Sequence, residues 1–118
     1  MAEIDEKKSP EFSIIIPAYN AECFISDAIQ SVQRQTLDCW ELIIIENGST
    51  DTTSTICEKY LTDPRIRLLH SVKGVSNARN AGIGAATGKW IVFLDADDLL
   101  LEDALQKFDA IDQRFSPD

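Results

Sequence analysis

The sequence WIVFLDADD, residues 90–98, places five apolar residues directly before three carboxylates. So short an apolar run, rich in aromatic and β-branched side chains, is typical of a strand buried on both faces of a parallel sheet. Open α/β sheets bind their ligands at the carboxyl ends of the strands. Because Asp95, Asp97 and Asp98 repel one another unless solvent or a cation offsets their charge, the stretch is either a solvated acidic turn or a metal site.

Three more short apolar runs precede this stretch. They span residues 12–16, 40–45 and 66–69. Pro17 is expected to end the first run, because proline cannot donate a hydrogen bond within a central strand. Each run has the length and composition of a buried strand.

Segments with helical periodicity follow the strands. The first helix is expected to open at Asn20 or Ala21 and to bury Phe24. The third is expected to start at Ser76 as its N-cap and to offer alanines and glycines for close backbone contact. The last is amphipathic, with an apolar side made of Leu101, Leu105, Phe108, Ile111 and Phe115. The order βαβαβαβα predicts an α/β fold, a Rossmann-like parallel sheet with helices on both faces.

Composition limits the classes of function. Among 118 residues, 20 are acidic and 11 basic, for a net charge of −9, which argues against a nucleic-acid partner. The longest apolar runs are about five residues, whereas a membrane-spanning helix needs about 20. Since residues 1–10 also lack the apolar core of a signal peptide, we expect a cytoplasmic protein. Residues 1–11 are expected to be a disordered leader, and residues 12–118 one domain.

Polar side chains gather at the predicted carboxyl edge of the sheet. Tyr19 there suits stacking near a nucleobase, Glu46 suits accepting from a base N–H, and Arg79 suits meeting a phosphate. Asp97 suits a divalent metal that bridges two phosphates. Each residue also has a purely structural interpretation, as a core aromatic, a turn cap, a surface cation or a solvated acid. Together they favour a nucleoside diphosphate site.

Four motifs carry a more specific resemblance. Residues 13–20, SIIIPAYN, resemble the first strand and turn of family 2 glycosyltransferases, which have the GT-A fold. Residues 44–53, IIENGSTDTT, resemble the second motif of that family. Residues 76–82, SNARNAG, resemble its ARNxG motif, and residues 94–98, LDADD, resemble its DxD metal motif. The four occur in the family's order and span most of residues 12–98.

The resemblance implies a nucleotide-activated sugar, often a UDP-sugar, as donor, with Mn²⁺ or Mg²⁺ as cofactor. Asp97 would ligate the metal, and Asp95 would contact the ribose or a metal-bound water. Carried over by position, the donor-binding residues would be Pro17, Ala18, Tyr19, Glu46, Arg79, Asp95, Ala96 and Asp97. The reaction implied is hexosyl transfer to a hydroxyl of a saccharide or lipid-linked saccharide acceptor, at the cytoplasmic face of the membrane if a longer protein is tethered there.

Two departures from the family pattern matter. Glu46 stands where the second motif usually begins with aspartate, which keeps the carboxylate but adds a methylene. Only twenty residues follow Asp98, whereas the family's acceptor half and general base lie well downstream of the DxD motif. The catalytic base is therefore not assigned. We expect the nucleotide-sugar-binding half of a GT-A domain, which transfers sugar poorly by itself.

Other functions stay open. The chain could be a non-catalytic nucleotide-binding or interaction module that retains the donor site. A phospho-receiver domain fits less well, since it needs paired acids after its first strand, where this chain has Pro17-Ala18-Tyr19. An apolar sheet edge or face left uncovered would favour self-association.

Overall fold

The computed structural model describes residues 10–115, with side chains to residue 112. Its four strands form one parallel sheet in the order β3-β2-β1-β4. The strands are β1 (Phe12–Ala18), β2 (Trp40–Glu46), β3 (Ile66–His70) and β4 (Trp90–Phe93). The helices are α1 (Ile25–Gln33), α2 (Thr53–Glu58) with the 3₁₀ turn η2 (Lys59–Thr62), α3 (Val75–Ala85) and α4 (Ala104–Phe115). Residues 1–9 of the predicted leader lie outside the described residues.

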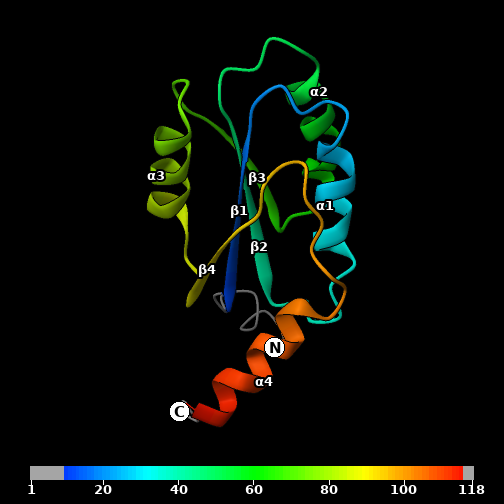
Figure 1. Cartoon of the computed structure of the whole chain (residues 1–118), viewed down its shortest axis with the longest axis vertical. Helices are drawn as coiled ribbons and strands as arrows, with labels where there is room; N and C mark the ends of the chain where they lie inside the picture. Colours follow the sequence, from blue (N-terminus) through cyan, green and yellow to red (C-terminus); the bar gives the residue numbers. More distant parts are fainter. Residues whose placement is uncertain (1–9, 116–118) are drawn as a thin grey trace, which may run out of the picture.

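Helices cover both faces of the sheet, which confirms the α/β prediction. In Figure 1, α1 and α2 lie against one face and α3 lies against the other. The buried side chains of β1 and β2 alternate between the two faces, so that Ile14 and Ile16 face α1 while Ile15 faces α3. Every helix among residues 10–115 is too short or too polar to traverse a bilayer.

β1 runs two residues further than predicted, through Pro17 to Ala18. The backbone N–H of Leu94 donates to the carbonyl of Ile15. Because backbone groups alternate in direction along a strand, the backbone of residues 15 and 17 is directed toward β4. β4 ends at Phe93, which pairs with Ile15, and no strand of the described chain lies opposite Pro17 on that side. The missing N–H of the proline therefore leaves no ladder bond unmade.

Two predicted helix starts are wrong. α1 begins at Ile25 rather than at residue 20 or 21, because residues 20–24 form a turn whose backbone is bonded to the loop after β2. α3 begins at Val75, directly after Gly74, so Ser76 lies inside the helix and is not its N-cap. Gly74 has φ of +129°, a backbone conformation that glycine adopts without strain.

α4 lies at the amino ends of the strands and covers neither face of the sheet (Figure 1). Leu105 is buried, and the Phe108 ring packs edge-on at 5.7 Å from Phe12 and 5.2 Å from Trp90, between ring centres. Leu101 precedes the helix and is 73% exposed, and Ile111 is 52% exposed, so the predicted apolar side is only partly buried. The side chain of Phe115 lies outside the described part of the chain.

Candidate functional site

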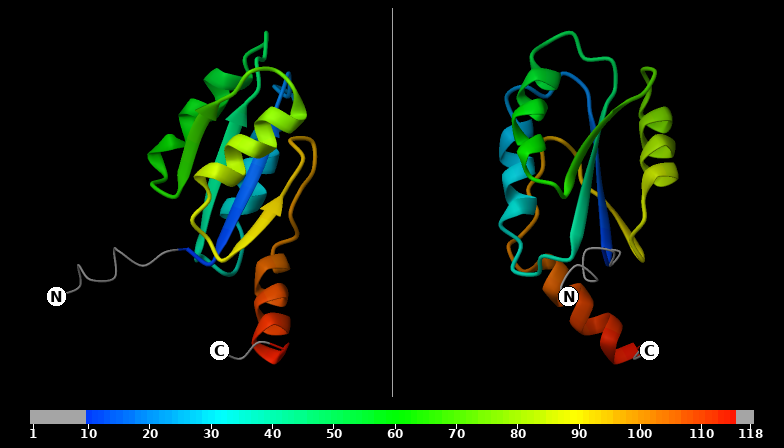
Figure 2. Two further views of the ribbon diagram at one scale, coloured as in Figure 1. Left: turned by 90° about the vertical axis from the view of Figure 1, so that its left-hand side faces the viewer. Right: turned by 180° about the vertical axis from the view of Figure 1, so that it is seen from behind.

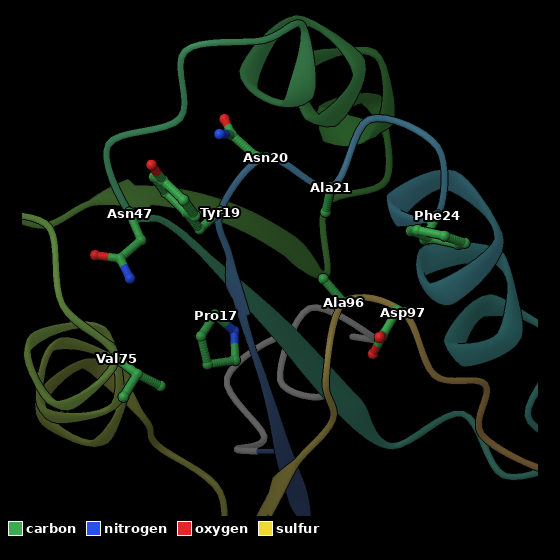
Figure 3. A pocket seen from close by; sticks show the side chains of 9 residues that line it. All are labelled: Pro17, Tyr19, Asn20, Ala21, Phe24, Asn47, Val75, Ala96 and Asp97. Atoms are coloured by element: carbon green, nitrogen blue, oxygen red, sulfur yellow. The ribbon is translucent and has the colours of Figure 1, made fainter.

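A pocket of about 300 Å³ opens at the carboxyl ends of β1, β2 and β4. Figure 3 shows its walls, which come from the turn after β1, the turn after β2, the first residue of α3 and the acidic turn after β4. The lining side chains are Pro17, Tyr19, Asn20, Ala21, Phe24, Asn47, Val75, Ala96 and Asp97. Its place agrees with the rule that parallel sheets bind ligands at this edge.

Hydrogen bonds join the loops after β1 and β2 into one unit. The side-chain oxygen of Asn20 accepts from the backbone N–H of Thr50 at 2.8 Å, and the N–H of Asn20 donates to the Ser49 hydroxyl at 2.9 Å. The N–H of Ala21 donates to the Thr53 hydroxyl at 2.8 Å. Asn20 has φ of +47°, which asparagine tolerates better than most residues. These bonds fix the neighbouring Tyr19 at the pocket, where its ring lies 4.7 Å from the Lys73 ammonium.

Glu46 holds the turn after β2 from beneath. It is 6% exposed, and its carboxylate accepts from the backbone N–H of Gly48 at 3.1 Å and of Ser49 at 2.8 Å. Gly48 has φ of +86°, which allows the chain to fold back over the carboxylate. Burial by itself raises the pKa of Glu46, but the hydrogen bonds from Ser49 and Gly48 outweigh it and hold the pKa below the usual value.

Glu46→Gln is therefore expected to remove an acid-sensitive part of the stability. A carboxyl whose pKa is lower in the folded state stabilises the fold above its unfolded pKa of about 4.5 and loses that contribution as pH falls through its folded value. We expect the variant to be roughly 1–3 kcal/mol less stable at pH 7 and the difference to shrink toward pH 3. Urea unfolding at several pH values measures it. A difference that stays constant from pH 7 to pH 3 would contradict this account.

Three carboxylates meet in the turn after β4. Asp95, Asp97 and Asp98 each offer an oxygen, and these oxygens lie within 4.8 Å of one another on exposed side chains. The backbone N–H of Asp98 donates to the carbonyl of Asp95 at 3.0 Å and closes the turn. Carboxylate oxygens are the ligands that Mg²⁺ and Mn²⁺ prefer, so this donor set fits a divalent cation. Of the three, Asp97 also lines the pocket.

The predicted site residues fall into two groups. Pro17, Tyr19, Ala96 and Asp97 line the pocket together. Ala18 and Glu46 are buried beneath it, Asp95 belongs to the carboxylate cluster, and Arg79 lies on α3 with its guanidinium 5.7 Å from the Phe93 ring centre. The second group does not line the pocket, and the predicted contact of every one of these residues with a donor stays a proposal.

Sequence reasoning did not include five residues of the pocket wall among the donor-binding residues, namely Asn20, Ala21, Phe24, Asn47 and Val75. Asn47 follows β2 directly, and the rule that selected Glu46 could have found it. Phe24 was expected inside a helix but is 54% exposed and faces the pocket, because α1 begins one residue later. Val75 carried no signal, since it is the first residue of a helix whose start was misplaced.

Comparison with known proteins places the chain in a family. The model of the glycosyl transferase family 2 matches residues 13–110, and the chain belongs to that family. The uncharacterized glycosyltransferase EpsJ of Bacillus subtilis is 44% identical over 100 residues, which are 83% of this chain and 29% of that protein. The Escherichia coli protein WfgD, named UDP-Glc:alpha-D-GlcNAc-diphosphoundecaprenol beta-1,3-glucosyltransferase, is 42% identical over 80% of this chain and 38% of its own length.

Solved structures confirm the GT-A-type fold. Staphylococcus aureus TarS 1–349, in complex with UDP-GlcNAc, superimposes with a TM-score of 0.83 at 28% identity, over 88% of this chain and 31% of TarS 1–349. Mannosyltransferase PcManGT of Pyrobaculum calidifontis, in complex with GDP-Man and Mn²⁺, gives a TM-score of 0.67 at 27% identity, over 79% of this chain and 29% of that chain. The chain spans between 16% and 40% of the length of the curated relatives compared with it.

Proposed function

We propose that this chain binds a nucleotide-activated sugar, a UDP-sugar first of all, together with Mn²⁺ or Mg²⁺. It would supply the donor-binding part of a glycosyltransferase that moves the sugar to an acceptor hydroxyl. The observation that carries the proposal is that the pocket and the carboxylate cluster share Asp97 at the carboxyl edge of a parallel sheet. The complexes of TarS with UDP-GlcNAc and of PcManGT with GDP-Man and Mn²⁺ support the class of ligand.

The nucleoside would lie in the part of the pocket formed by the loops after β1 and β2. Pro17 and the Tyr19 ring offer it apolar and aromatic surface. The two loops are bonded to each other through Asn20, so little order has to be created when the nucleoside binds. Glu46 would act by holding the turn that carries Asn47, because Gly48 and Ser49 already donate to its carboxylate.

The diphosphate would lie toward the turn after β4. A dianion beside three carboxylates is unfavourable unless charge is supplied, and a divalent cation held by Asp97, with Asp95 acting directly or through water, neutralises the departing diphosphate when bound. Asp97, which lines the pocket, would hold the cation there, while the backbone bond from Asp98 to Asp95 closes the turn. Arg79 on α3 would lie on the phosphate side of the donor.

The acceptor is proposed to be a saccharide or a lipid-linked saccharide. The name of WfgD specifies an acceptor linked to diphosphoundecaprenol, and this chain matches 38% of that protein. A lipid-linked acceptor is consistent with a cytoplasmic protein that works at the membrane face. Transfer itself would need groups beyond the donor site, and the described residues supply the donor part.

Calorimetric titration of UDP into the chain tests the donor site. We expect binding with Mn²⁺ or Mg²⁺ present and at least about tenfold weaker binding with the cation chelated, because the diphosphate then faces the carboxylates unscreened. Titration of adenosine diphosphate under the same conditions is the control for the base. The absence of any heat with UDP and either cation would overturn the proposal.

A further inference from the structure

The segment between β3 and α3, residues 71–74, is attached to the turn after β2. The Ser71 hydroxyl donates to the side-chain oxygen of Asn47 at 3.2 Å, and Asn47 lines the pocket. A methyl group placed on Gly48 would lie 3.5 Å from Cβ of Lys73, so the lysine packs against the turn. Figure 2 shows this segment together with the loops after β1 and β2 at the end of the sheet opposite α4. The segment therefore borders the pocket.

A cation from this segment lies against one ring of the pocket wall. The Lys73 ammonium is 4.7 Å from the ring centre of Tyr19. Tyr19 lines the pocket and Lys73 does not, so the cation meets the ring from outside the pocket. The described chain has four cation–aromatic contacts, and only this one involves a ring that lines the pocket. A cation on one face of a ring leaves the other face for stacking.

Hydrogen bonds fix the backbone on both sides of this contact. The carbonyl of Lys73 accepts from the side chain of Asn77 in α3 at 3.1 Å. On the other side, Asn20 next to Tyr19 is bonded to the loop after β2. The Tyr19 ring itself is 40% exposed, so the backbone bonds alone leave it room to turn. Contact with the ammonium restricts the ring before any ligand arrives, which lowers the entropy cost of binding.

We propose that Lys73 is a positioning residue for the nucleobase of the donor, which it serves by holding one face of the Tyr19 ring so that the other face stacks on the base. The inference rests on the proposed function of the pocket as a nucleotide-sugar site. Lys73 acts through the ring and does not touch the donor. Because Lys73 is exposed, we expect the contact to change the affinity for the nucleotide about two- to fivefold.

Titration calorimetry of UDP with Mn²⁺ present tests the proposal on the parent chain and its variants. Lys73→Met keeps an unbranched side chain but removes the charge, and it is expected to raise the dissociation constant about two- to fivefold. Lys73→Arg keeps a cation over the ring and is expected to bind UDP as the parent does. In a Tyr19→Leu background, Lys73→Met is expected to change nothing further, because the ring through which Lys73 acts is gone.

Lys107→Met is the matched control for net charge. Lys107 lies on α4 at the opposite end of the sheet, 3.4 Å from Asp103, and its loss should leave UDP binding unchanged. Direct attraction between Lys73 and the phosphates would persist without the ring. A loss of the same size in the Tyr19→Leu background would therefore overturn the proposal, and so would equal binding by the parent and Lys73→Met.

Proton NMR tests the contact without a ligand. The ε-methylene protons of Lys73 are expected to be shifted upfield by the Tyr19 ring and to return to their usual position in Tyr19→Leu. Protons that are unshifted in the parent chain would overturn the proposal. A parent chain that binds no UDP would overturn the proposed function and this inference together, whereas UDP binding that is indifferent to Lys73→Met would overturn this inference alone.

Discussion

Asp97→Ala is expected to weaken Mn²⁺-dependent UDP binding by roughly 100-fold or more, given that even outer-shell changes around metals cost 10–100-fold. Asp97 is the carboxylate that both belongs to the cluster after β4 and lines the pocket. If Asp97 holds the cation as proposed, its loss would remove a ligand and leave the diphosphate without the charge that screens Asp95 and Asp98. Titration calorimetry at saturating Mn²⁺ measures the change.

Two matched variants sharpen this result. Asp103→Ala removes a carboxylate that lies 3.4 Å from Lys107 and outside both the cluster and the pocket lining, and it should bind UDP as the parent chain does. Asp98→Ala removes a member of the cluster that does not line the pocket, so we expect an intermediate loss. Equal losses for Asp97→Ala and Asp103→Ala would show that the cluster does not act through a bound cation.

Gly82→Ala is expected to destabilise the fold by about 1–3 kcal/mol, the usual cost of forcing an extra carbon into a close-packed core. A methyl group at residue 82 would come within 2.5 Å of Cγ2 and 3.0 Å of Cδ1 of Ile15. Ile15 is fully buried in β1, so it has little freedom to move away. The cost outweighs alanine's better helix propensity of up to about 1 kcal/mol. Urea unfolding measures the difference.

Gly84→Ala is the control on the same helix. A methyl group at residue 84 meets no atom within 4 Å, so only the helix propensity changes. We expect a gain of about 0.5–1 kcal/mol. Opposite signs for the two substitutions would establish that α3 lies on the sheet through Gly82, and a shared sign would contradict it.

The fold could be predicted from the sequence because its strands are buried on both faces. Continuous apolar runs such as residues 42–45 leave few alternatives, and the alternation of strands with helices fixes a parallel sheet. The direction of α4 could not be predicted: Phe108 contacts Phe12 and Trp90 at the amino ends of their strands, while Leu105 belongs to the core cluster on the α1 face. Apolar periodicity predicts that one side of a helix is buried, but it does not identify the surface against which that side packs.

The site was predictable in its position and less so in its details. Tyr19 follows β1 directly and Asp97 lies in the turn after β4, and the carboxyl edge of the sheet brings them to one pocket. The inward direction of Glu46 depends on Gly48 closing the turn, which spacing alone does not reveal. Phe24 lines the pocket because the backbone hydrogen bonds of Asn20 and Ala21 keep residues 20–24 in a turn, so that α1 begins only at Ile25. Hydrogen bonds of this kind produce no periodicity in the sequence and could not be predicted from it.

The placement of α4 has a practical consequence for surface-based assays. The first residues of β1 and the whole of α4 lie at the amino ends of the strands, whereas the pocket opens at the carboxyl ends (Figure 1). A dye, an affinity handle or a sensor chip joined to the chain after residue 115 would therefore lie on the far side of the sheet. Immobilised in this way, the domain would present its pocket to the solution.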